Sequence, residues 1–200
     1  MVLCMNDIKK LIIDHAKYRF DRFGYKKTTM DEISRDCRIS KKTIYSYFKD
    51  KEHLFYCLLL YESRTAKNHI LAKIREFDDP VEQLKILIKT TVEYFNQNRF
   101  LVRFLNDDHA LFPSVLQKKY RQEVEESLIP LIAEILIQGK KNGKIRDVDT
   151  VSIACVILKM FLYCMQTRDL EEDKEPLGYS VKVLIDLLTQ GLLQNESIST

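Results

Sequence analysis

A stretch of nine residues, 40–48, places lysine, hydroxyl and phenol side chains on one short predicted helix. Ser40 is a residue type that caps helix N-termini, and Ile44 and Phe48 lie four residues apart, so they form an inward-facing stripe. At the helical period of 3.6 residues, three side chains point away from this stripe: Lys42, Thr43 and Ser46. Lysine and hydroxyl groups donate hydrogen bonds to base edges and phosphates, so this helix has the chemistry of a nucleic-acid contact.

Further cations and phenols flank the same helix. Lys41, Tyr45 and Tyr47 lie beside the inward stripe, and Lys51 falls in the first turn of the next predicted helix. Positive charge at a helix N-terminus is disfavoured by the helix dipole, which indicates that these lysines serve something other than folding. The alternative is that the lysines are simply solvated and the tyrosines pack half-buried on the first helix.

The residues just before residue 40 predict a second short helix and a tight turn. Thr29 with Glu32 three residues later is a capping box, in which each side chain accepts a hydrogen bond from the other residue's backbone N–H. Arg38 lies in the turn that follows. Two short helices at 29–37 and 40–48, joined in this way, are typical of a helix-turn-helix motif that enters the major groove of DNA.

Seven motifs agree in residue type and spacing with a known signature: Phe23-Gly24-Tyr25, Thr28-Thr29-Met30, Glu32-Ile33, Ile39-Ser40, Lys42-Thr43-Ile44-Tyr45, Tyr47-Phe48, and Lys51-Glu52 with Leu54. On these motifs, residues 8–55 resemble the N-terminal region of TetR-family transcriptional regulators. The rest of the chain resembles the family in length and helix count. The resemblance implies a homodimer that binds a palindromic operator in double-stranded DNA. It also implies release, most simply as a repressor, when a small-molecule effector of unknown identity enters the C-terminal domain.

Carried over position by position, the family's base-facing residues fall on Lys41, Lys42 and Thr43. Its phosphate contacts fall on four further residues: Thr29, Tyr45, Tyr47 and Lys51. Ser46 points outward on the same helix and joins the predicted DNA-binding surface. The family usually has glycine where this chain has Arg38. A left-handed backbone there would cost Arg38 about 1–2 kcal/mol, and the alternative is a shifted backbone at this turn. The Arg38 guanidinium is in addition a candidate phosphate contact.

Composition favours an all-α fold. The 200 residues include only five glycines and four prolines, fewer than average usage, so turns are scarce and the elements between them are long. This composition argues against a β sandwich or barrel. We predict about nine helices, near 7–23, 29–37, 40–48, 50–77, 81–97, 99–112, 113–139, 151–165 and 177–193. Pro130 predicts a kink, or two separate helices, within the seventh range.

Two domains follow from this pattern: a helix-turn-helix DNA-binding domain at 1–49, and a larger effector-binding and dimerisation domain at 50–200. The distribution of charge along the sequence supports this division into two domains. Residues 1–55 carry 13 Lys and Arg against eight Asp and Glu, whereas the remaining residues carry 19 against 21. A basic N-terminal quarter on a slightly acidic body favours a polyanion as its partner.

The cellular setting predicted from the sequence is the reducing cytoplasm. The five cysteines are an odd number without a Cys-x-x-Cys pair, which does not suit a disulfide framework. No apolar run reaches the length of a membrane span, and the first ten residues lack the apolar stretch of a secretory signal. We therefore expect no membrane partner.

Apolar and aromatic positions of the C-terminal region are core residues by default. If the family logic holds, some of them line an effector pocket, because such pockets are apolar with a few polar groups. The candidates are Tyr61, Phe95, Phe104, His109, Phe112, Met160 and Tyr163, with His109 as the polar one. They predict a small apolar or aromatic effector.

The last two predicted helices carry more apolar residues than one buried stripe per helix requires. An excess on two adjacent helices predicts a four-helix dimer interface, with burial in the core of a single chain as the alternative. The residues proposed for this interface are Val151, Cys155, Leu158, Leu162, Val181, Leu184, Ile185 and Leu188.

Two other classes of protein compete with a DNA-binding regulator. A helical enzyme lacks support, because the sequence shows no nucleophile triad, carboxylate pair or phosphate loop. His53 and Cys57 lie one turn apart but have no third ligand at matching spacing, so neither a metal nor another cofactor is predicted. A helical protein-interaction module without specific DNA binding remains the alternative.

Overall fold

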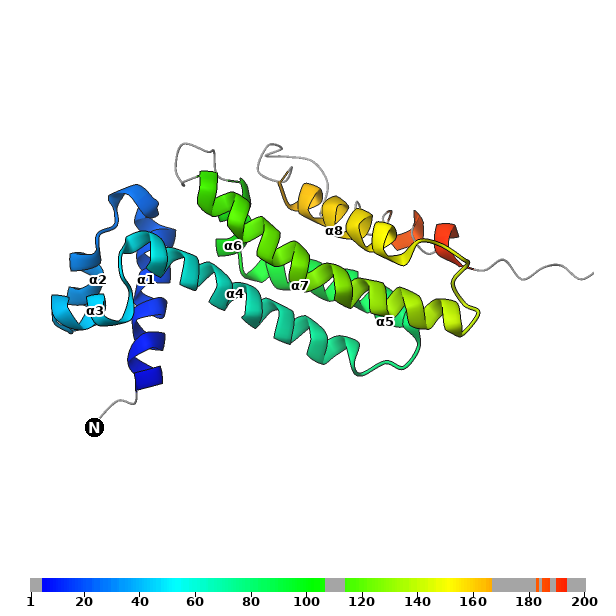
Figure 1. Ribbon diagram of the computed structural model, residues 1–200, viewed down its shortest axis with the longest axis horizontal. Helices are drawn as coiled ribbons and strands as arrows, with labels where there is room; N and C mark the ends of the chain where they lie inside the picture. Colours follow the sequence, from blue (N-terminus) through cyan, green and yellow to red (C-terminus); the bar gives the residue numbers. More distant parts are fainter. Residues whose placement is uncertain (1–4, 107–113, 167–182, 184, 188–189, 194–200) are drawn as a thin grey trace, which may run out of the picture. The chain divides into compact units, whose positions relative to one another are not determined.

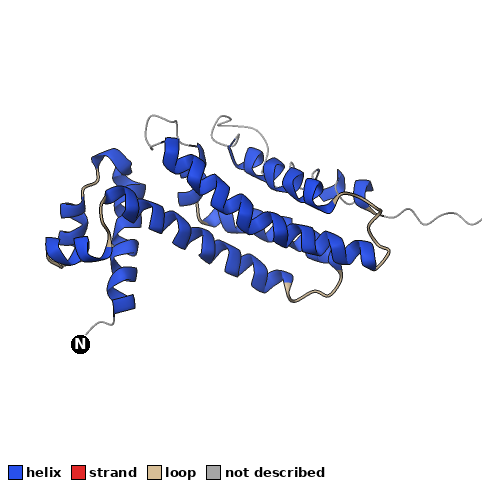
Figure 2. Ribbon diagram, in the orientation of Figure 1, coloured by secondary structure: helices blue, strands red, loops and turns tan. Residues whose placement is uncertain are grey.

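The computed structural model describes residues 5–106, 114–166, 183, 185–187 and 190–193, and these residues are almost entirely helical (Figures 1 and 2). Eight helices are complete in this part of the chain: α1 (Met5–Lys27), α2 (Met30–Asp36), α3 (Lys41–Tyr47), α4 (Lys51–Ile74), α5 (Pro80–Gln97), α6 (Phe100–Asn106), α7 (Ser114–Lys141) and α8 (Thr150–Gln166). The described residues between 183 and 192 are also helical. The all-α prediction is confirmed.

The chain divides into two compact units, which are described separately. The first comprises residues 1–64 and 107–120, and the second comprises residues 65–106 and 121–200. Helix α4 therefore contributes its first half to one unit and its second half to the other. None of the helices in the described ranges is both long and apolar enough to cross a membrane.

In the N-terminal unit, α2 packs against α1, and α3 packs against α2 (Figure 1). Ile12, Ala16, Ile33 and Phe55 are completely buried at the centre of this unit. At the surface, the Arg19 guanidinium of α1 pairs with the carboxylates of two α2 residues: Asp36, at 2.5 Å, and Glu32, at 3.3 Å. The apolar core and these ion pairs fix α2 on α1.

Helix α1 is interrupted near its C-terminus. The backbone at Gly24 has φ of 78°, a left-handed value that glycine adopts without a Cβ penalty. The Thr28 hydroxyl, which is fully buried, donates a hydrogen bond to the Gly24 carbonyl at 2.9 Å. The helical conformation thus stops at Gly24, as the sequence predicts, although helical hydrogen bonding resumes as far as Lys27.

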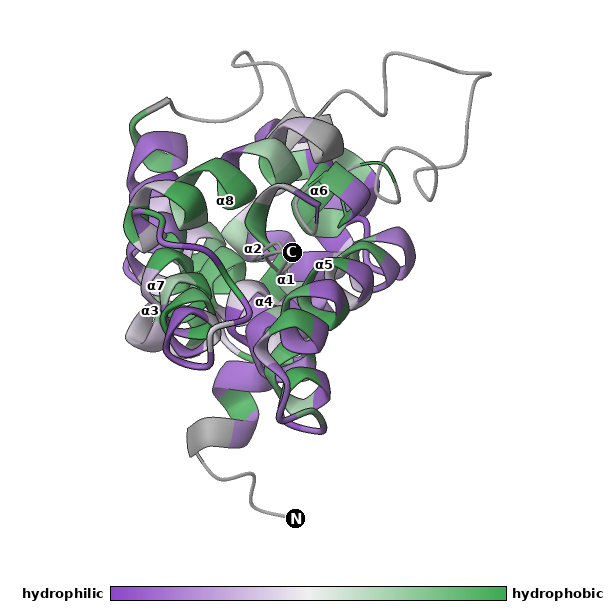
Figure 3. Cartoon of the chain, turned by 90° about the vertical axis from the view of Figure 1, so that its right-hand side faces the viewer, coloured by the Kyte–Doolittle hydropathy of each residue, from purple (hydrophilic) through white to green (hydrophobic). Residues whose placement is uncertain are grey.

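The C-terminal unit has an apolar interior made by the second half of α4 with α5, α7 and α8. Its larger cluster includes Ile70, Leu84, Leu136 and Leu158. A smaller cluster contains Ile88, Val92 and Val102 of α5 and α6. Figure 3 shows that α8 is mostly hydrophobic along its length.

Helix α7 continues without interruption through Pro130, so the predicted separation into two helices is wrong. Proline removes one backbone donor and disturbs the preceding turn. Here, Leu128 and Ile129 before it and Ile132 after it all pack on the larger apolar cluster. We attribute the continuity of the helix to this packing, which holds the turns on both sides of the proline.

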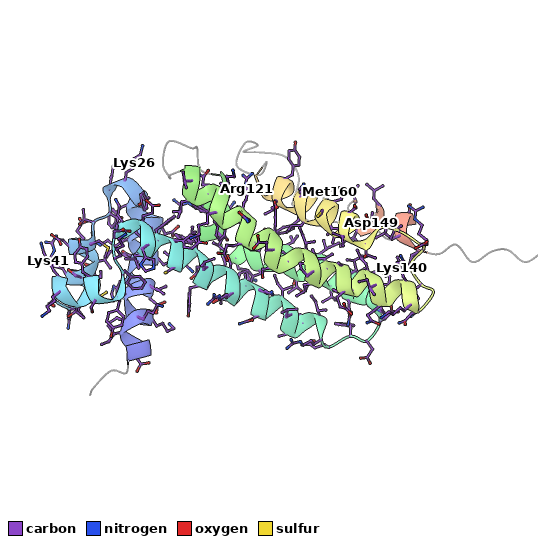
Figure 4. All side chains as sticks on the ribbon, viewed as in Figure 1. Lys26, Lys41, Arg121, Lys140, Asp149 and Met160 are labelled. Carbon is purple, nitrogen blue, oxygen red and sulfur yellow. The ribbon has the colours of Figure 1, made fainter. Side chains whose placement is uncertain are left out.

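The turn between α7 and α8 is closely packed. A Cβ on Gly139 would lie 2.4 Å from Cδ1 of Ile145, so a larger residue there would require the Ile145 side chain to shift. Ile145 pairs with Leu193 in an isolated antiparallel bridge, and the Arg146 N–H donates to the Leu192 carbonyl at 3.0 Å. The Lys140 ammonium, labelled in Figure 4, donates to the Val148 carbonyl across the turn.

Candidate nucleic-acid interface

The N-terminus of α2 is held by the capping box that the sequence predicts. The Thr29 hydroxyl accepts a hydrogen bond from the Glu32 N–H, and the Glu32 carboxylate accepts one from the Thr29 N–H. The Thr29 hydroxyl also lies 2.9 Å from the Glu32 carboxylate and donates to it. This hydrogen bond, the one from the Thr29 N–H and the charge of Arg19 lower the pKa of the Glu32 carboxyl. Thr29 is exposed beside this cap, so its position is fixed and open to solvent.

Helix α3 is anchored on one side and open on the other. Ile44 and Phe48 are completely buried, whereas Lys42, Tyr45 and Ser46 are exposed. The Ser40 hydroxyl accepts a hydrogen bond from the Thr43 N–H at 3.0 Å and thereby caps the helix. A seven-residue helix is marginal alone, so this cap and the two buried side chains determine which face it presents.

The turn between α2 and α3 has a left-handed residue where the family has glycine. Arg38 has φ of 55° and is exposed. The turn is closed by a hydrogen bond from the Ile39 N–H to the Ser34 carbonyl at 3.0 Å. Beside it, burial raises the pKa of the Cys37 thiol to about 11.

Lys41 and Lys42, adjacent in sequence, differ in their surroundings. The Lys41 ammonium forms an exposed ion pair with the Asp31 carboxylate of α2. Figure 4 labels Lys41 at the edge of the N-terminal unit. Lys42 has no hydrogen-bond or ion-pair partner among the described residues. Lys42 can therefore meet an incoming anion directly, whereas Lys41 must first exchange Asp31 for it.

Lys51, predicted from the family resemblance to contact phosphate, is engaged within the protein. Its ammonium donates hydrogen bonds to the carbonyls of Tyr25, at 2.9 Å, and Thr28, at 3.0 Å. It also lies 4.4 Å from the centre of the Tyr25 ring. Burial lowers the pKa of Lys51. Sequence reasoning missed this contact, because the carbonyls that accept from Lys51 lie 26 and 23 residues earlier in the chain.

Two further predicted residues of α3, Thr43 and Tyr47, are partly enclosed. Thr43 is half-buried and its hydroxyl lies 2.8 Å from that of Ser40. Ser46 donates its hydroxyl to the Thr43 carbonyl at 2.7 Å, and Tyr47 is half-buried. The outward group on this helix is therefore Lys42, Tyr45 and Ser46, next to Arg38 and Lys41 at the turn. Among the described residues, no cluster of three His, Cys, Asp or Glu offers a metal site.

The predicted effector residues fall in different environments. Phe104 is buried, and the Phe95 ring lies 5.8 Å from that of Phe161 in the C-terminal unit. Met160 and Tyr163 are exposed on α8, while Tyr61 is half-buried in the N-terminal unit. Two candidates lie outside the described residues: His109 and Phe112.

The residues predicted for the dimer interface also differ in their exposure to solvent. Leu158 is buried within its own chain, and Cys155 and Leu162 are half-buried, whereas Val151 is exposed. Ile185 packs against the smaller apolar cluster. Three candidates lie outside the described residues: Val181, Leu184 and Leu188. The exposed apolar side chains of α8 are instead at Val151, Val156, Met160 and Tyr163, a set only partly proposed from sequence.

Comparison with known proteins identifies the class. Residues 12–56 match the family described as bacterial regulatory proteins of the tetR family, and residues 80–172 match the tetracyclin repressor-like C-terminal domain. The Bacillus subtilis HTH-type transcriptional regulator YhgD, described as uncharacterized, is 30% identical over 194 residues. That match covers 94% of this chain and 98% of the relative.

Two solved structures share the fold. The transcriptional regulator FadR from Bacillus subtilis, in complex with stearoyl-CoA, has a TM-score of 0.76 and 21% identity, and the match covers 91% of this chain and 98% of FadR. AibR, in complex with isovaleryl coenzyme A and operator DNA, has a TM-score of 0.64 and 19% identity, and the match covers 90% of this chain and 97% of AibR.

This chain belongs to the TetR family of helix-turn-helix transcriptional regulators. It is therefore a DNA-binding, ligand-responsive regulator, in a family of regulators rather than enzymes.

The left-handed turn gives a prediction for stability. Arg38→Gly removes about 1–2 kcal/mol of backbone strain from the folded state. It also stabilises the unfolded chain by about 0.4–1 kcal/mol, because glycine gives that chain more conformational entropy. We expect a net stabilisation, measured as a higher urea midpoint by circular dichroism. Arg38→Ala is the matched control, because it removes the guanidinium and keeps the strain, so its midpoint should not rise. A midpoint for Arg38→Gly below that of Arg38→Ala would show that the turn is unstrained.

Proposed function

We propose that this protein is a repressor that binds a palindromic operator as a homodimer through α3 and leaves it when a small apolar or aromatic effector binds. The observation that carries the proposal is the two-sided character of α3. Ile44 and Phe48 anchor it in the core, while Lys42, Tyr45 and Ser46 face solvent together. A helix of this length with exposed donors fits the DNA major groove.

The surface around α3 supplies a second ring of donors. Arg38, Lys41 and Thr29 are exposed at the turn and at the capped start of α2. We assign these three to phosphate or base contacts, with Thr43 and Tyr47 as partly enclosed contributors. In this arrangement Lys51 acts first by holding the chain after α1, because its ammonium already binds two carbonyls there.

Effector control follows from the geometry that a dimer must meet. Two recognition helices must lie about one DNA turn, roughly 34–36 Å, apart to read a palindrome. An effector that favours another spacing weakens DNA binding by the difference in its affinity for the two states. Helix α4 is the proposed link, because it runs unbroken from Lys51 to Ile74 and so belongs to both units.

The homodimer is supported by the exposed face of α8. Val156, Met160 and Tyr163 follow an i, i+4, i+7 spacing, so they lie on one side of the helix, and all three are exposed. Leu187, in the helical residues near the C-terminus, is exposed as well. Apolar side chains gathered in this way are typical of a helical dimer interface. Met160 and Tyr163 thus suit the interface better than the effector pocket.

Two similar solved structures, both in complex with acyl-coenzyme A thioesters, favour this class of compound as the effector. FadR is described in complex with stearoyl-CoA and AibR with isovaleryl coenzyme A. In the described part of the C-terminal unit, the Phe95 and Phe161 rings pack on the smaller apolar cluster, and Phe104 is buried. An apolar and aromatic interior of this kind suits an acyl chain.

The competing class is a helical interaction module without specific DNA binding. Salt dependence separates the two classes, because each neutralised phosphate lowers log K by about 0.9 for every unit of log salt concentration. Duplex binding with a slope near zero would favour the module.

Lys42→Ala tests the DNA-reading surface on an operator selected from a random duplex pool. Loss of a base-edge contact is expected to cost about 1–3 kcal/mol and to relax the sequence preference at the contacted position. Fluorescence anisotropy with matched and mutated operators measures both effects. Lys89→Ala, an exposed lysine of α5, is the control and should bind like the parent. A pool that yields no palindrome, or equal binding by both variants, would refute the proposal.

Val156→Asp tests the dimer. A carboxylate buried at the interface without a partner is expected to weaken self-association by about tenfold or more. Sedimentation velocity over a concentration series measures the change. Val115→Asp is the control, because Val115 is an exposed valine on α7 outside the α8 face. If the parent protein stays monomeric, or if both variants dimerise normally, the α8 interface is wrong.

Isovaleryl-CoA and stearoyl-CoA test the effector class. Either thioester is expected to release the labelled operator in a concentration-dependent manner, with free coenzyme A as the control for the headgroup alone. Anisotropy of the operator measures the release. If neither thioester acts while operator binding persists, the acyl-CoA assignment fails and the DNA-binding assignment stands.

A further inference from the structure

The ammonium of Lys51 uses all three of its donors inside the N-terminal unit. It donates hydrogen bonds to the carbonyls of Tyr25, at 2.9 Å, and Thr28, at 3.0 Å, and a third, longer one to the Lys26 carbonyl at 3.5 Å. A lysine ammonium has three N–H donors and no acceptor. Lys51 can therefore bind a phosphate oxygen only after at least one of these hydrogen bonds is broken.

The ring of Tyr25 contacts the same ammonium. Nζ of Lys51 lies 4.4 Å from the centre of this ring, which is a cation–π distance. The ring is itself fixed, because it stacks on Phe20, at 5.7 Å between ring centres, and meets Phe55 edge-on at 5.0 Å. Phe55 follows Lys51 by four residues, so both side chains leave the same face of α4. We call the contacts of Lys51 with the Tyr25 ring and the three carbonyls the Lys51 anchor.

The anchor satisfies the end of α1. Helix α1 is interrupted at Gly24 and ends at Lys27, and carbonyls at a helix C-terminus lack partners within the helix. The negative end of the helix dipole also attracts a cation. Lys51 supplies both the donors and the charge. This role accounts for a lysine in the first turn of α4, where the dipole of α4 itself disfavours positive charge.

The anchor lies directly before the start of α2. Thr28 is fully buried, and its hydroxyl donates to the Gly24 carbonyl at 2.9 Å while its own carbonyl accepts from Lys51. The next residue, Thr29, is the N-cap of α2 and one of the proposed DNA contacts. The path of the chain into α2 is therefore held from α4, and the position of Thr29 depends on it.

We propose that Lys51 and Tyr25 are positioning residues for operator binding, and that Lys51 itself makes no contact with DNA phosphate. The family resemblance implies a phosphate contact at Lys51, so this chain departs from it. The inference rests on the proposed operator binding and deepens it, because it identifies what holds a contact residue in place. Without the anchor, residues 25–29 must be ordered at the moment of binding, and the cost of that ordering lowers the affinity.

Lys51→Met tests this distinction, because methionine keeps an unbranched stem and removes the charge with all three donors. Operator affinity is expected to fall by about tenfold or more. The slope of log K against log salt concentration should equal that of the parent, whereas loss of a phosphate contact would reduce it by about 0.9 for each subunit. Fluorescence anisotropy at several sodium chloride concentrations measures both quantities. Lys89→Met, at an exposed lysine of α5, is the matched control and should bind like the parent.

Tyr25→Leu tests the aromatic part of the anchor, since it removes the ring and keeps the carbonyl. Operator binding is expected to weaken by about two- to fivefold. In the Lys51→Met background the same change should have a smaller effect, because the ammonium that the ring contacts is already gone. Tyr25→Phe keeps the ring and is the control, and circular dichroism melting confirms that every variant is folded. Additive effects of the two substitutions would overturn the role of Tyr25.

Amine reactivity gives a readout on the parent protein itself. Limited acetylation with sulfo-N-hydroxysuccinimide acetate is followed by peptide mass spectrometry, with and without the selected operator. Lys51 is expected to react slowly in the free protein, and the operator should not change its rate. Lys42, which is exposed and has no partner among the described residues, should react readily and be protected by the operator. If Lys51 behaves like Lys42, it is a phosphate contact and the proposal is wrong.

The outcomes separate this proposal from the function on which it rests. If the parent protein binds no duplex, operator binding is wrong as its function, and the role of the anchor is wrong with it. If the parent binds the selected operator but Lys51→Met lowers the salt slope, or leaves the affinity unchanged, only the positioning role is wrong. The DNA-binding assignment then stands.

Discussion

Burial of Ile44 and Phe48 is the interaction on which the proposed DNA-reading surface depends. Helix α3 has seven residues, and a helix of that length does not persist alone in water. Each fully buried side chain contributes about 1.5–3 kcal/mol, and together the two residues fix the rotation of the helix about its axis. That rotation places Lys42, Tyr45 and Ser46 in solvent. A rotated or frayed α3 would lose the surface even with every donor present.

The cations near α3 differ in what they must give up to bind an anion. Lys42 has no partner among the described residues, so its ammonium gives up only water. The Lys41–Asp31 pair is exposed, and pairs of that kind contribute little, so exchanging the carboxylate for a phosphate costs little. To bind an anion, the Lys51 ammonium would have to break its hydrogen bonds to two carbonyls and move away from the Tyr25 ring. The lysine at position 42 is thus available to bind an anion, whereas the lysine at position 51 holds two segments of the protein together.

Local sequence rules predicted the parts of the fold that depend on neighbours along the chain. The Thr29–Glu32 capping box, the Ser40 cap and the stop at Gly24 each involve residues within four positions of one another. The alternative of two separate helices at Pro130 was wrong, because packing of α7 against the larger apolar cluster is a long-range effect that no local rule includes. The family resemblance assigned Lys51 to a phosphate contact and did not predict the contact that its ammonium makes with Tyr25, 26 residues earlier.

The sequence alone determined the helical class, the helix-turn-helix segment and the outward face of α3, because hydrophobic period, caps and turn residues act within a few residues. Only the tertiary structure decided which apolar residues of α8 are buried. Leu158 packs in its own chain while Val156 stays exposed, although both are apolar residues of one helix. It also placed the Lys51 ammonium on the carbonyls of Tyr25 and Thr28, which lie 26 and 23 residues earlier in the chain. Residues so far apart in sequence become neighbours only when separate helices pack, and no spacing rule encodes that packing.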